Sequence, residues 1–529
     1  MTDPASAAVD SAAASNGVSN GKKTNQLADL DRFNPLRSST DNEDDDDDHD
    51  DLRPLDDSEL SSASYLARLA GVACLLGLQF GWDTGIASGM LVAIHADLGH
   101  DLSEGEQELI VSATTVGAIL GSIVAGRMAD WLGRKKVMVG AGILFLLGAM
   151  EQAASQVVRE LVLGRVLVGL GVGMASMVVP TYLAEIAPTK VRGRIIGINS
   201  LLITGGQVIA YLIDAAFYNL PHGWRWMVLA GGVPAIFQLI GMIYLDESPR
   251  WLVARGRIIR ARHVLQRIYP RASVRAIDNE IERIARSMEG TTQRDAVDPD
   301  SAHAADPQQL VGFNSLMYFS GRLLLMAGFV LNPNAAAVGI AIANFVGTLI
   351  AMRYIDIWGR RKLLLYTTAA MTFFLSLVAI GFSQIDLGPI TGGPPTTTTT
   401  TTTTTPTSAW PYLTLAFMIL FTLSYALGLG IVPWLIQSEI FSGQVRGVGA
   451  GLATATNWST NLLISSTFLH MVKWIRPQGC FGLFSVVAAL SWAFTYWQLP
   501  EMAGVSLSDV GGEAEREVYR AVPAEEESD

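Results

Sequence analysis

About twelve apolar stretches, each long enough to cross a bilayer as a helix, constrain the fold of this 529-residue chain. Half of the residues are hydrophobic, 16% are charged and the mean hydropathy is +0.32. A membrane-crossing helix needs about 20 apolar residues and satisfies its own backbone hydrogen bonds in lipid. The sequence therefore predicts an all-α polytopic membrane protein. The predicted spans are 65–93, 108–130, 137–156, 159–184, 195–218, 225–245, 310–331, 334–355, 363–384, 411–436, 447–472 and 478–498.

A loop motif occurs twice, once in each half of the chain. The first copy covers 126–136 and the second, weaker copy covers 354–362. Asp130 in the first copy and Asp356 in the second are 226 positions apart (356 − 130), and both copies lie between predicted spans. The repeat predicts two pseudo-symmetric six-helix halves. In transporters, such halves enclose a substrate site near the bilayer midplane.

Basic residues are concentrated in every second linker between the predicted spans. The linkers between them carry mainly Asp and Glu instead. The positive-inside rule places basic linkers in the cytoplasm, so both termini are expected there. We expect the membrane itself to be the plasma membrane. The basic linkers are those at 134–136, 192–194, 250–286, 360–362 and 446.

The chain divides into five predicted regions. The first is an acidic tail, expected to be disordered because its unbroken run of aspartates cannot bury apolar area. Two six-helix halves flank a cytoplasmic linker in which apolar residues at helical spacing predict short basic helices. The second half includes a threonine-rich loop, expected to be extracellular, flexible and open to O-glycosylation. The regions are 1–62, 63–245, 246–309, 310–499 (threonine-rich loop 386–409) and the cytoplasmic tail 500–529.

The seventh predicted span departs from the repeat. The first span begins near Leu66, which places the start of its counterpart near position 292 (66 + 226), but residues 290–309 are polar. The apolar stretch 310–331 carries Arg322 in its middle. A buried arginine costs about 2.5–3.5 kcal/mol on insertion scales unless it is paired or reaches the interface. We expect the cytoplasmic half of this helix to be missing, through splicing, a gene-model error or degeneration.

Two opposite charges lie inside predicted spans, where charges are functional by default. Asp83 is in the first span and Arg165 is in the fourth. A carboxylate that alternates between an arginine partner and a proton can couple proton binding to a conformational change. The alternative is a static structural ion pair.

Amide and indole side chains inside the spans are the candidate substrate ligands. Amides offer donors and acceptors, and indole offers an apolar face, a combination that suits a polyol. Any one of them alone could instead join neighbouring helices. They are Gln207, Gln308, Gln309, Asn314, Asn344, Trp434, Asn457 and Trp458.

Charged residues at the cytoplasmic ends of the spans are duplicated between the halves. Such clusters can lock one membrane face and release it when the halves rock. They could alternatively serve only to fix orientation. The predicted gating residues are Asp130, Arg134, Glu185 and Arg192 in the first half, and Asp356, Arg360, Glu439 and Arg446 in the second.

The sequence lacks the patterns that would indicate an enzyme. We find no nucleotide-binding signature, no nucleophile and base at motif spacing, and no metal-ligand cluster among the seven histidines. Cys74 and Cys480 both fall in apolar runs, where a buried, inert thiol is expected. The net charge of −12, much of it in the acidic tail, argues against a nucleic-acid partner. We therefore expect no cofactor.

Several motifs give the chain a family resemblance. Over about 65–510 it resembles the sugar porters of the major facilitator superfamily, and within them fungal myo-inositol/proton symporters. The family motifs lie at 126–136, Glu185 with 192–194, 247–252, 308–309, 359–361, and Pro500 with Glu501 and Gly504. The closer match rests on 198–201 with 204–207, 223–226, 314–320 and 453–458.

The resemblance implies a monomer with the major facilitator fold that imports myo-inositol or a similar polyol with protons by alternating access. It also implies that Asp83 and Arg165 couple protons and that Gln207, Gln308, Gln309, Asn314, Trp434 and Asn457 contact substrate. The sequence departs from the family at Trp82, where tyrosine is usual, and at Arg322, where an uncharged residue is usual. A hexose transporter, a transport-incompetent variant and a substrate sensor remain alternatives.

Overall fold

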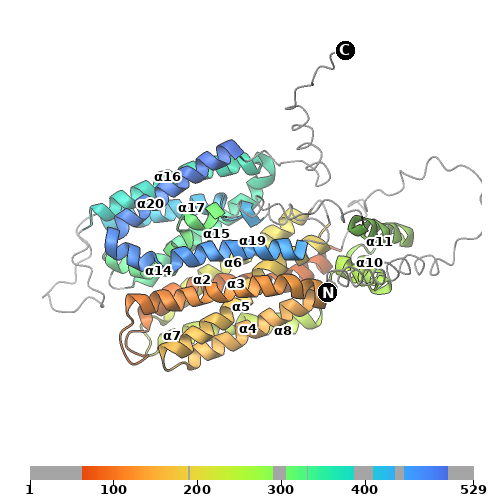
Figure 1. Cartoon of the computed structure of the whole chain (residues 1–529), viewed down its shortest axis with the longest axis horizontal. Coiled ribbons are helices and arrows are strands. Elements are labelled where there is room, and N and C mark those ends of the chain that lie inside the picture. The colour runs from red at the N-terminus through yellow and green to blue at the C-terminus, as the bar shows by residue number, and fades with distance from the viewer. Residues whose placement is uncertain are drawn as a thin grey trace, which may run out of the picture.

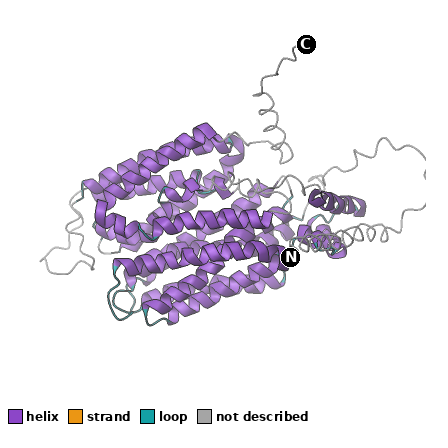
Figure 2. Ribbon diagram, in the orientation of Figure 1, coloured by secondary structure: helices purple, strands orange, loops and turns teal. Residues whose placement is uncertain are grey.

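The computed structural model describes residues 62–188, 191–289, 306–329, 332–385, 409–434 and 446–498. Every regular element in these ranges is a helix, as Figure 2 shows. Ten helices there are long and apolar enough to cross a membrane. The predicted acidic tail, most of the threonine-rich loop and the C-terminal tail lie outside the described residues.

The first half contains six spans, and the described helices of the second half pack beside them (Figure 1). The first-half helices are α2 (Ala63–Ala93), α3 (Glu104–Leu132), α4 (Arg134–Ala154), α5 (Val158–Ile186), α6 (Arg192–Phe217), and α7 (Gly223–Ala230) with α8 (Gly232–Ile243) as one span. The second-half helices are α14 (Phe313–Met326), α15 (Pro333–Trp358), α16 (Arg360–Ser383), α17 (Trp410–Leu427), α19 (Arg446–Ser465) and α20 (Phe468–Gln498). The halves meet where α3 packs on α19, α6 on α15 and α2 on α14.

The repeated loop motif has the same backbone conformation in both halves. Gly133 joins α3 to α4 with φ 102° and ψ 160°, and Gly359 joins α15 to α16 with φ 82° and ψ 158°. A positive φ is open to glycine and strained for other residues. The predicted duplication is therefore visible in the fold, because each copy makes the same sharp turn between two long helices.

Gly133 also has no room for a side chain. A Cβ atom there would lie 2.2 Å from a carboxylate oxygen of Glu247. We expect Gly133→Ala to destabilise the protein by about 1–3 kcal/mol, the usual range for a strained backbone site. The thermal midpoint of the purified protein in detergent would measure this. Gly140→Ala on α4 is the matched control, because its Cβ would meet only the Met174 methyl group at 3.5 Å; an equal loss in both variants would contradict the prediction.

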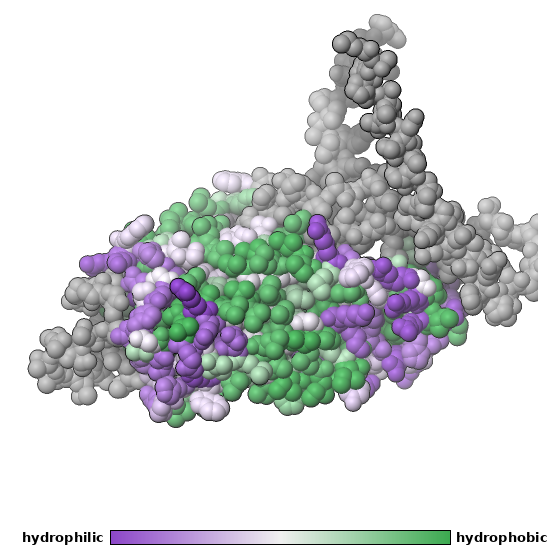
Figure 3. Space-filling model, turned by 60° about the horizontal axis from the view of Figure 1, so that its bottom comes forward, coloured by the Kyte–Doolittle hydropathy of each residue, from purple (hydrophilic) through white to green (hydrophobic). Residues whose placement is uncertain are grey.

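The outer surface fits a bilayer. Figure 3 shows a continuous hydrophobic band between two hydrophilic ends. Large apolar side chains such as Leu120, Phe237 and Leu490 are at least half exposed within the spans. Contiguous apolar surface of this extent marks contact with lipid or a partner.

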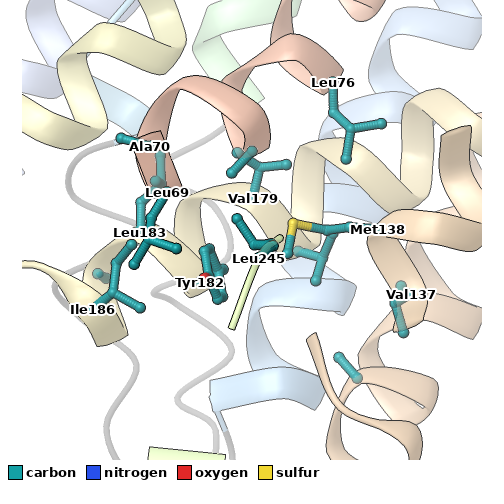
Figure 4. Packing of buried hydrophobic residues seen from close by; sticks show 14 of the residues in the cluster. Leu69, Ala70, Leu76, Val137, Met138, Val179, Tyr182, Leu183, Ile186 and Leu245 are labelled. Carbon is teal, nitrogen blue, oxygen red and sulfur yellow. The ribbon is translucent and has the colours of Figure 1, made fainter. Parts of the chain in front are cut away.

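Apolar packing holds each half together. One buried cluster joins α2, α4 and α5 with the segment that follows α8, as Figure 4 shows for Leu69, Met138, Val179 and Leu245. Helices α2 and α6 approach each other closely at Gly81. A Cβ atom on Gly81 of α2 would lie 1.7 Å from the carbonyl oxygen of Ile203, so only glycine permits this contact. Small residues allow such close packing of membrane helices.

Three short helices form the described part of the linker between the halves. They are α9 (Pro249–Ala254), α10 (Ile258–Ile268) and α11 (Val274–Glu289), and they lie at one end of the bundle (Figure 1). The apolar residues Ala261, Val264, Leu265 and Ile268 of α10 are buried. We call this end of the bundle the linker end and the opposite end the far end.

Within the described residues, the seventh span is a broken helix. It comprises α13 (Asp306–Leu310) and α14, separated at Gly312, which has φ 76°. α14 has 14 residues, roughly 21 Å at 1.5 Å per residue, less than a hydrocarbon core of about 30 Å. α13, α14 and the relatively polar α19 are not among the ten crossing helices. Residues 290–305 lie outside the described part, so the missing half-helix stays a prediction.

Candidate functional site

The two intramembrane charges face each other across α2 and α5. A terminal nitrogen of Arg165 donates to the carboxylate of Asp83 in an ion pair. The Arg165 side chain is fully buried, and that of Asp83 is 9% exposed. The Nε of Arg165 also donates to the carbonyl oxygen of Ile110 at 3.3 Å. A water-excluded pair of this kind depends on both partners, because removing one leaves an uncompensated buried charge.

Four of the predicted substrate ligands form one chain of amides. Asn314 Nδ2 donates to Gln309 Oε1 at 2.7 Å, and Gln309 Nε2 donates to Asn457 Oδ1 at 2.9 Å. Asn457 Nδ2 then donates to Gln308 Oε1 at 2.9 Å. The chain joins α13 and α14 to α19. Its members can exchange these mutual bonds for bonds to hydroxyl groups, because each amide has a donor and an acceptor.

Gln207 belongs to a separate contact between the halves. Asn344 Nδ2 on α15 donates to Gln207 Oε1 on α6 at 2.6 Å, and both side chains are buried. The described contacts do not connect this pair directly to the amide chain. It nevertheless places another amide pair on the surface along which the halves meet.

A hollow lies between the halves. Trp434 lies in its wall, and the hollow is partly open to solvent. An adjoining hollow shares Trp434 and Ser200 and extends to Arg194 and Met352. Mostly apolar walls with a few polar groups are typical of small-molecule sites. The first hollow is lined by Gly77, Phe80, Ala175, Ser176, Pro180, Ile196, Asn199, Ser200, Ile203 and Trp434.

Trp458 connects this hollow to the amide chain. Its indole nitrogen donates to the hydroxyl of Ser176 at 3.2 Å, and its ring lies 5.4 Å from that of Phe80. Ser176 and Phe80 both line the hollow, and Asn457 directly precedes Trp458 in the chain. The hollow and the amides therefore adjoin one another at the surface between the halves.

Charged groups are clustered at the linker end of the first half. Arg134 lies 3.3 Å from Asp130 and 2.9 Å from Glu185. Glu247, which follows α8, accepts from the backbone N–H of Arg134 at 2.9 Å and of Lys135 at 3.2 Å. Burial raises the pKa of Glu247 above its ordinary value, and the backbone donors oppose this shift. The start of α4 thus holds a carboxylate, as helix N-termini favour.

The other predicted gating residues are only partly described. Arg192 begins α6 and Arg360 begins α16. Glu439 and the side chains of Asp356 and Arg446 lie outside the described part of the structure. Their predicted role in the second half therefore stays a prediction.

Sequence reasoning did not select several residues that join helices within or between the halves. Within the second half, Asn461 donates to the Tyr318 hydroxyl at 3.3 Å. Across the halves, the hydroxyls of Ser88 and Ser320 lie 2.9 Å apart. The Tyr211 hydroxyl donates to the carbonyl oxygen of Met317 at 2.6 Å. Single serines and tyrosines are common in apolar helices, so the sequence does not mark them as contact residues. Only the packing of the helices shows which of them lie opposite one another.

Several relatives match this chain over most of its length. Myo-inositol transporter 1 of Cryptococcus neoformans is 39% identical over 86% of this chain and 82% of its own length. Myo-inositol transporter 2 of Schizosaccharomyces pombe is 37% identical over 87% and 84%. Inositol transporter 4 of Arabidopsis thaliana is 33% identical over 84% and 91%.

The fold is shared with a solved transporter. The proton:xylose symporter XylE bound to 6-bromo-6-deoxy-D-glucose has a TM-score of 0.72 and 23% identity, covering 85% of this chain and 99% of that one. This likeness establishes the major facilitator fold. A family model described as "Sugar (and other) transporter" matches residues 69–512. The chain therefore belongs to this family of membrane transporters and not to a family of enzymes.

Proposed function

We propose that this protein imports myo-inositol, or a similar polyol, together with protons by alternating access. The names of the fungal and plant relatives support the substrate class. The observation that carries the proposal is the buried Asp83–Arg165 pair, located in the same half that lines the hollow with Phe80 and Ser176. The protein is proposed to act as a monomer in the plasma membrane, without a cofactor.

Proton coupling is assigned to the pair on α2 and α5. When a proton binds the Asp83 carboxylate, the charge that attracts Arg165 is removed. Arg165 then keeps its bond to Ile110 and loses its ionic partner. A proton thus changes the relative free energy of conformations that differ in the packing of α2 against α5, and such a difference shifts their populations.

Substrate recognition is assigned to the amide chain, Gln207 and Trp434. A cyclic polyol has hydroxyl groups at its rim, which amides can bind as donors and as acceptors. Its C–H faces suit the indole of Trp434, which lines the hollow. Substrate would replace the bonds that Gln308, Gln309, Asn314 and Asn457 make with one another, so little buried hydrogen bonding is lost.

The linker end is proposed to be cytoplasmic, together with both termini. The basic residues of α10 and α11 lie at this end, as the positive-inside rule requires. The hollow that includes Arg194 extends toward the same end, where α6 begins. The pairs of Arg134 with Asp130 and Glu185 would tie α3, α4 and α5 together when that end closes, and Arg192, Asp356, Arg360, Glu439 and Arg446 are proposed to act with them.

A transport-incompetent variant is the second candidate. The observation that favours it is the length of α14, which has 14 residues and is too short to cross the bilayer alone. A transporter needs the seventh span to seal the space between the halves. Uptake by the purified protein is therefore the decisive measurement.

Reconstituted liposomes with an acidic exterior would test both candidates. We expect labelled myo-inositol to accumulate and a protonophore to reduce the level to simple equilibration. With one proton per substrate, one pH unit stores about 1.4 kcal/mol and supports at most about tenfold accumulation. Preferred uptake of labelled glucose would indicate a hexose transporter instead. No uptake of either by protein that binds inositol would indicate the incompetent variant.

A further inference from the structure

A group of polar residues joins the two halves at the far end, away from the predicted gates. α3 contributes its first turns, α14 contributes one arginine and the start of α20 contributes two residues. Figure 1 shows α14 at the end of the bundle opposite α10 and α11. We call this group the outer lock. It comprises Glu104, Gln107 and Glu108 on α3, Arg322 on α14, and His470 and Lys473 on α20.

Each contact in the outer lock crosses from one half to the other. Arg322 Nη1 donates to Gln107 Oε1 at 2.5 Å, and its Nη2 lies 3.3 Å from Glu104 Oε1. Lys473 Nζ lies 3.7 Å from the other carboxylate oxygen of Glu104. Glu108 accepts from the backbone N–H of His470 at 3.0 Å and also contacts its ring. The second half is thus attached to α3 at three positions.

The buried part of the outer lock is centred on Arg322. The Glu104 and Glu108 side chains are 10% and 5% exposed, and Arg322 is 24% exposed. Lys473 and His470 are about half exposed, so solvent screens their contribution. A largely buried, hydrogen-bonded charge pair is sensitive to the loss of one partner. Arg322 and Glu104 are therefore the residues whose change should matter most.

The same contacts explain how an arginine is accommodated in the seventh span. Arg322 lies in the last turns of α14, which ends at Met326. At that position its guanidinium reaches the first turn of α3 instead of the hydrocarbon centre. Paired arginines near helix ends avoid most of the insertion cost. The residue at which this sequence departs from the family resemblance thus has a specific partner in the opposite half.

We propose that the outer lock holds the far end closed and so sets the balance between the two conformations of the transport cycle. The contacts of the outer lock lie at the far end, whereas the hollow lined by Arg194 extends toward the linker end. Separation of the halves at the far end must break the Glu104–Arg322 contact. The inference rests on alternating access from the proposed function, but it is independent of the substrate and of proton coupling.

Charge reversal and charge exchange in nanodiscs would test the outer lock, because both faces of the protein are then accessible. Cys74 and Cys480 are first replaced by serine. One reporter, Ala87→Cys, lies buried among second-half residues near the far end, and another, Ser200→Cys, lines the hollow. The measurement is the rate at which a water-soluble maleimide labels each reporter.

Arg322→Glu is expected to raise labelling at position 87 by about tenfold or more and to lower it at position 200. The exchange variant Glu104→Arg with Arg322→Glu restores opposite charges and should return both rates toward those of the parent. Glu106→Gln is the matched control, because Glu106 lies in the same turn as Glu104 but contacts His100 and Ser103 within its own half. It should leave both rates unchanged.

Three outcomes would overturn the outer lock. Unchanged labelling at position 87 in Arg322→Glu would show that the pair does not hold the far end closed. Faster labelling at both reporters, without recovery in the exchange variant, would indicate general loosening of the fold. If Glu106→Gln changed the labelling rates equally, loss of any charge from this turn would be enough to open the far end, and the effect would not be specific to the Glu104–Arg322 pair. None of these results depends on transport, so failure of the proposed substrate or of proton coupling would be distinguished from failure of the lock.

Discussion

Asp83→Asn is expected to abolish accumulation of substrate against its gradient while leaving substrate exchange across the membrane. Asparagine has the shape of the neutral, protonated carboxyl group but cannot release a proton. Position 83 would then remain neutral throughout the transport cycle, so the fully buried Arg165 would have no ionic partner there. Liposomes with a pH gradient of one unit should fall from up to about tenfold accumulation to equilibration. Exchange of labelled for unlabelled inositol measures the retained binding and conformational change.

Asp214→Asn provides the matched control for this experiment. Asp214 is also fully buried in the first half, on α6, but it accepts from the backbone N–H of Gly89 at 3.1 Å and has no cationic partner among the described residues. An amide oxygen can accept the same bond, so accumulation should persist. Accumulation that survives Asp83→Asn would remove Asp83 from the coupling mechanism. Loss of accumulation in both variants would show that removing any buried acid from this half abolishes accumulation, so the effect would not be specific to Asp83.

Gln309→Ala is expected to weaken binding of myo-inositol by about 5- to 150-fold. The Gln309 amide lies at the centre of the amide chain, because it accepts from Asn314 and donates to Asn457. Its removal takes the partner from Asn314 Nδ2 and from Asn457 Oδ1, and it takes one donor and one acceptor from the substrate. An unsatisfied buried polar group costs about 1–3 kcal/mol, which corresponds to that range of Kd. Calorimetric titration of the purified protein measures it.

Gln384→Ala is the matched control for the amide chain. Gln384 follows α16 at an exposed position, and among the described contacts its side chain donates only to the Ser383 hydroxyl. Its replacement should leave the Kd unchanged. A Gln309→Ala variant that binds inositol as tightly as the parent would show that the amide chain is interhelical packing and not a substrate site. Asn457→Ala should resemble Gln309→Ala, since Asn457 bonds both glutamines.

The position of a charge within an apolar run was enough to single out Asp83 and Arg165, which the structure shows as a buried ion pair. A charge in lipid is costly, so a span retains one only where the fold provides a partner or a function. The same reasoning flagged Arg322 but could not name its partner. Glu104 is 218 positions away (322 − 104), and it looked like an ordinary acidic residue of a linker. Only the packing of the halves brings the two together.

The seventh span illustrates a different limit of sequence reasoning. The repeat predicted a missing half-helix before α14, and this stays a prediction because residues 290–305 lie outside the described part of the structure. It did not indicate that Gln308 and Gln309 lie on a separate helix, α13, turned away from α14 at Gly312. From the sequence alone, a glycine that breaks a helix in an apolar stretch cannot be distinguished from a glycine that lets two helices pack closely. The positive φ of Gly312 follows from the contacts around it.

The sequence by itself determined the membrane helices, their duplication and the buried charges, because these follow from local composition and from the cost of polarity in lipid. The tertiary structure decided which side chains meet. It joined Gln309 to Asn457, Gln207 to Asn344 and Arg322 to Glu104, each across more than a hundred positions. The physical reason is that a helical pattern specifies an apolar face but not the neighbour on which that face packs. The contacts between the halves therefore depend on the assembled bundle.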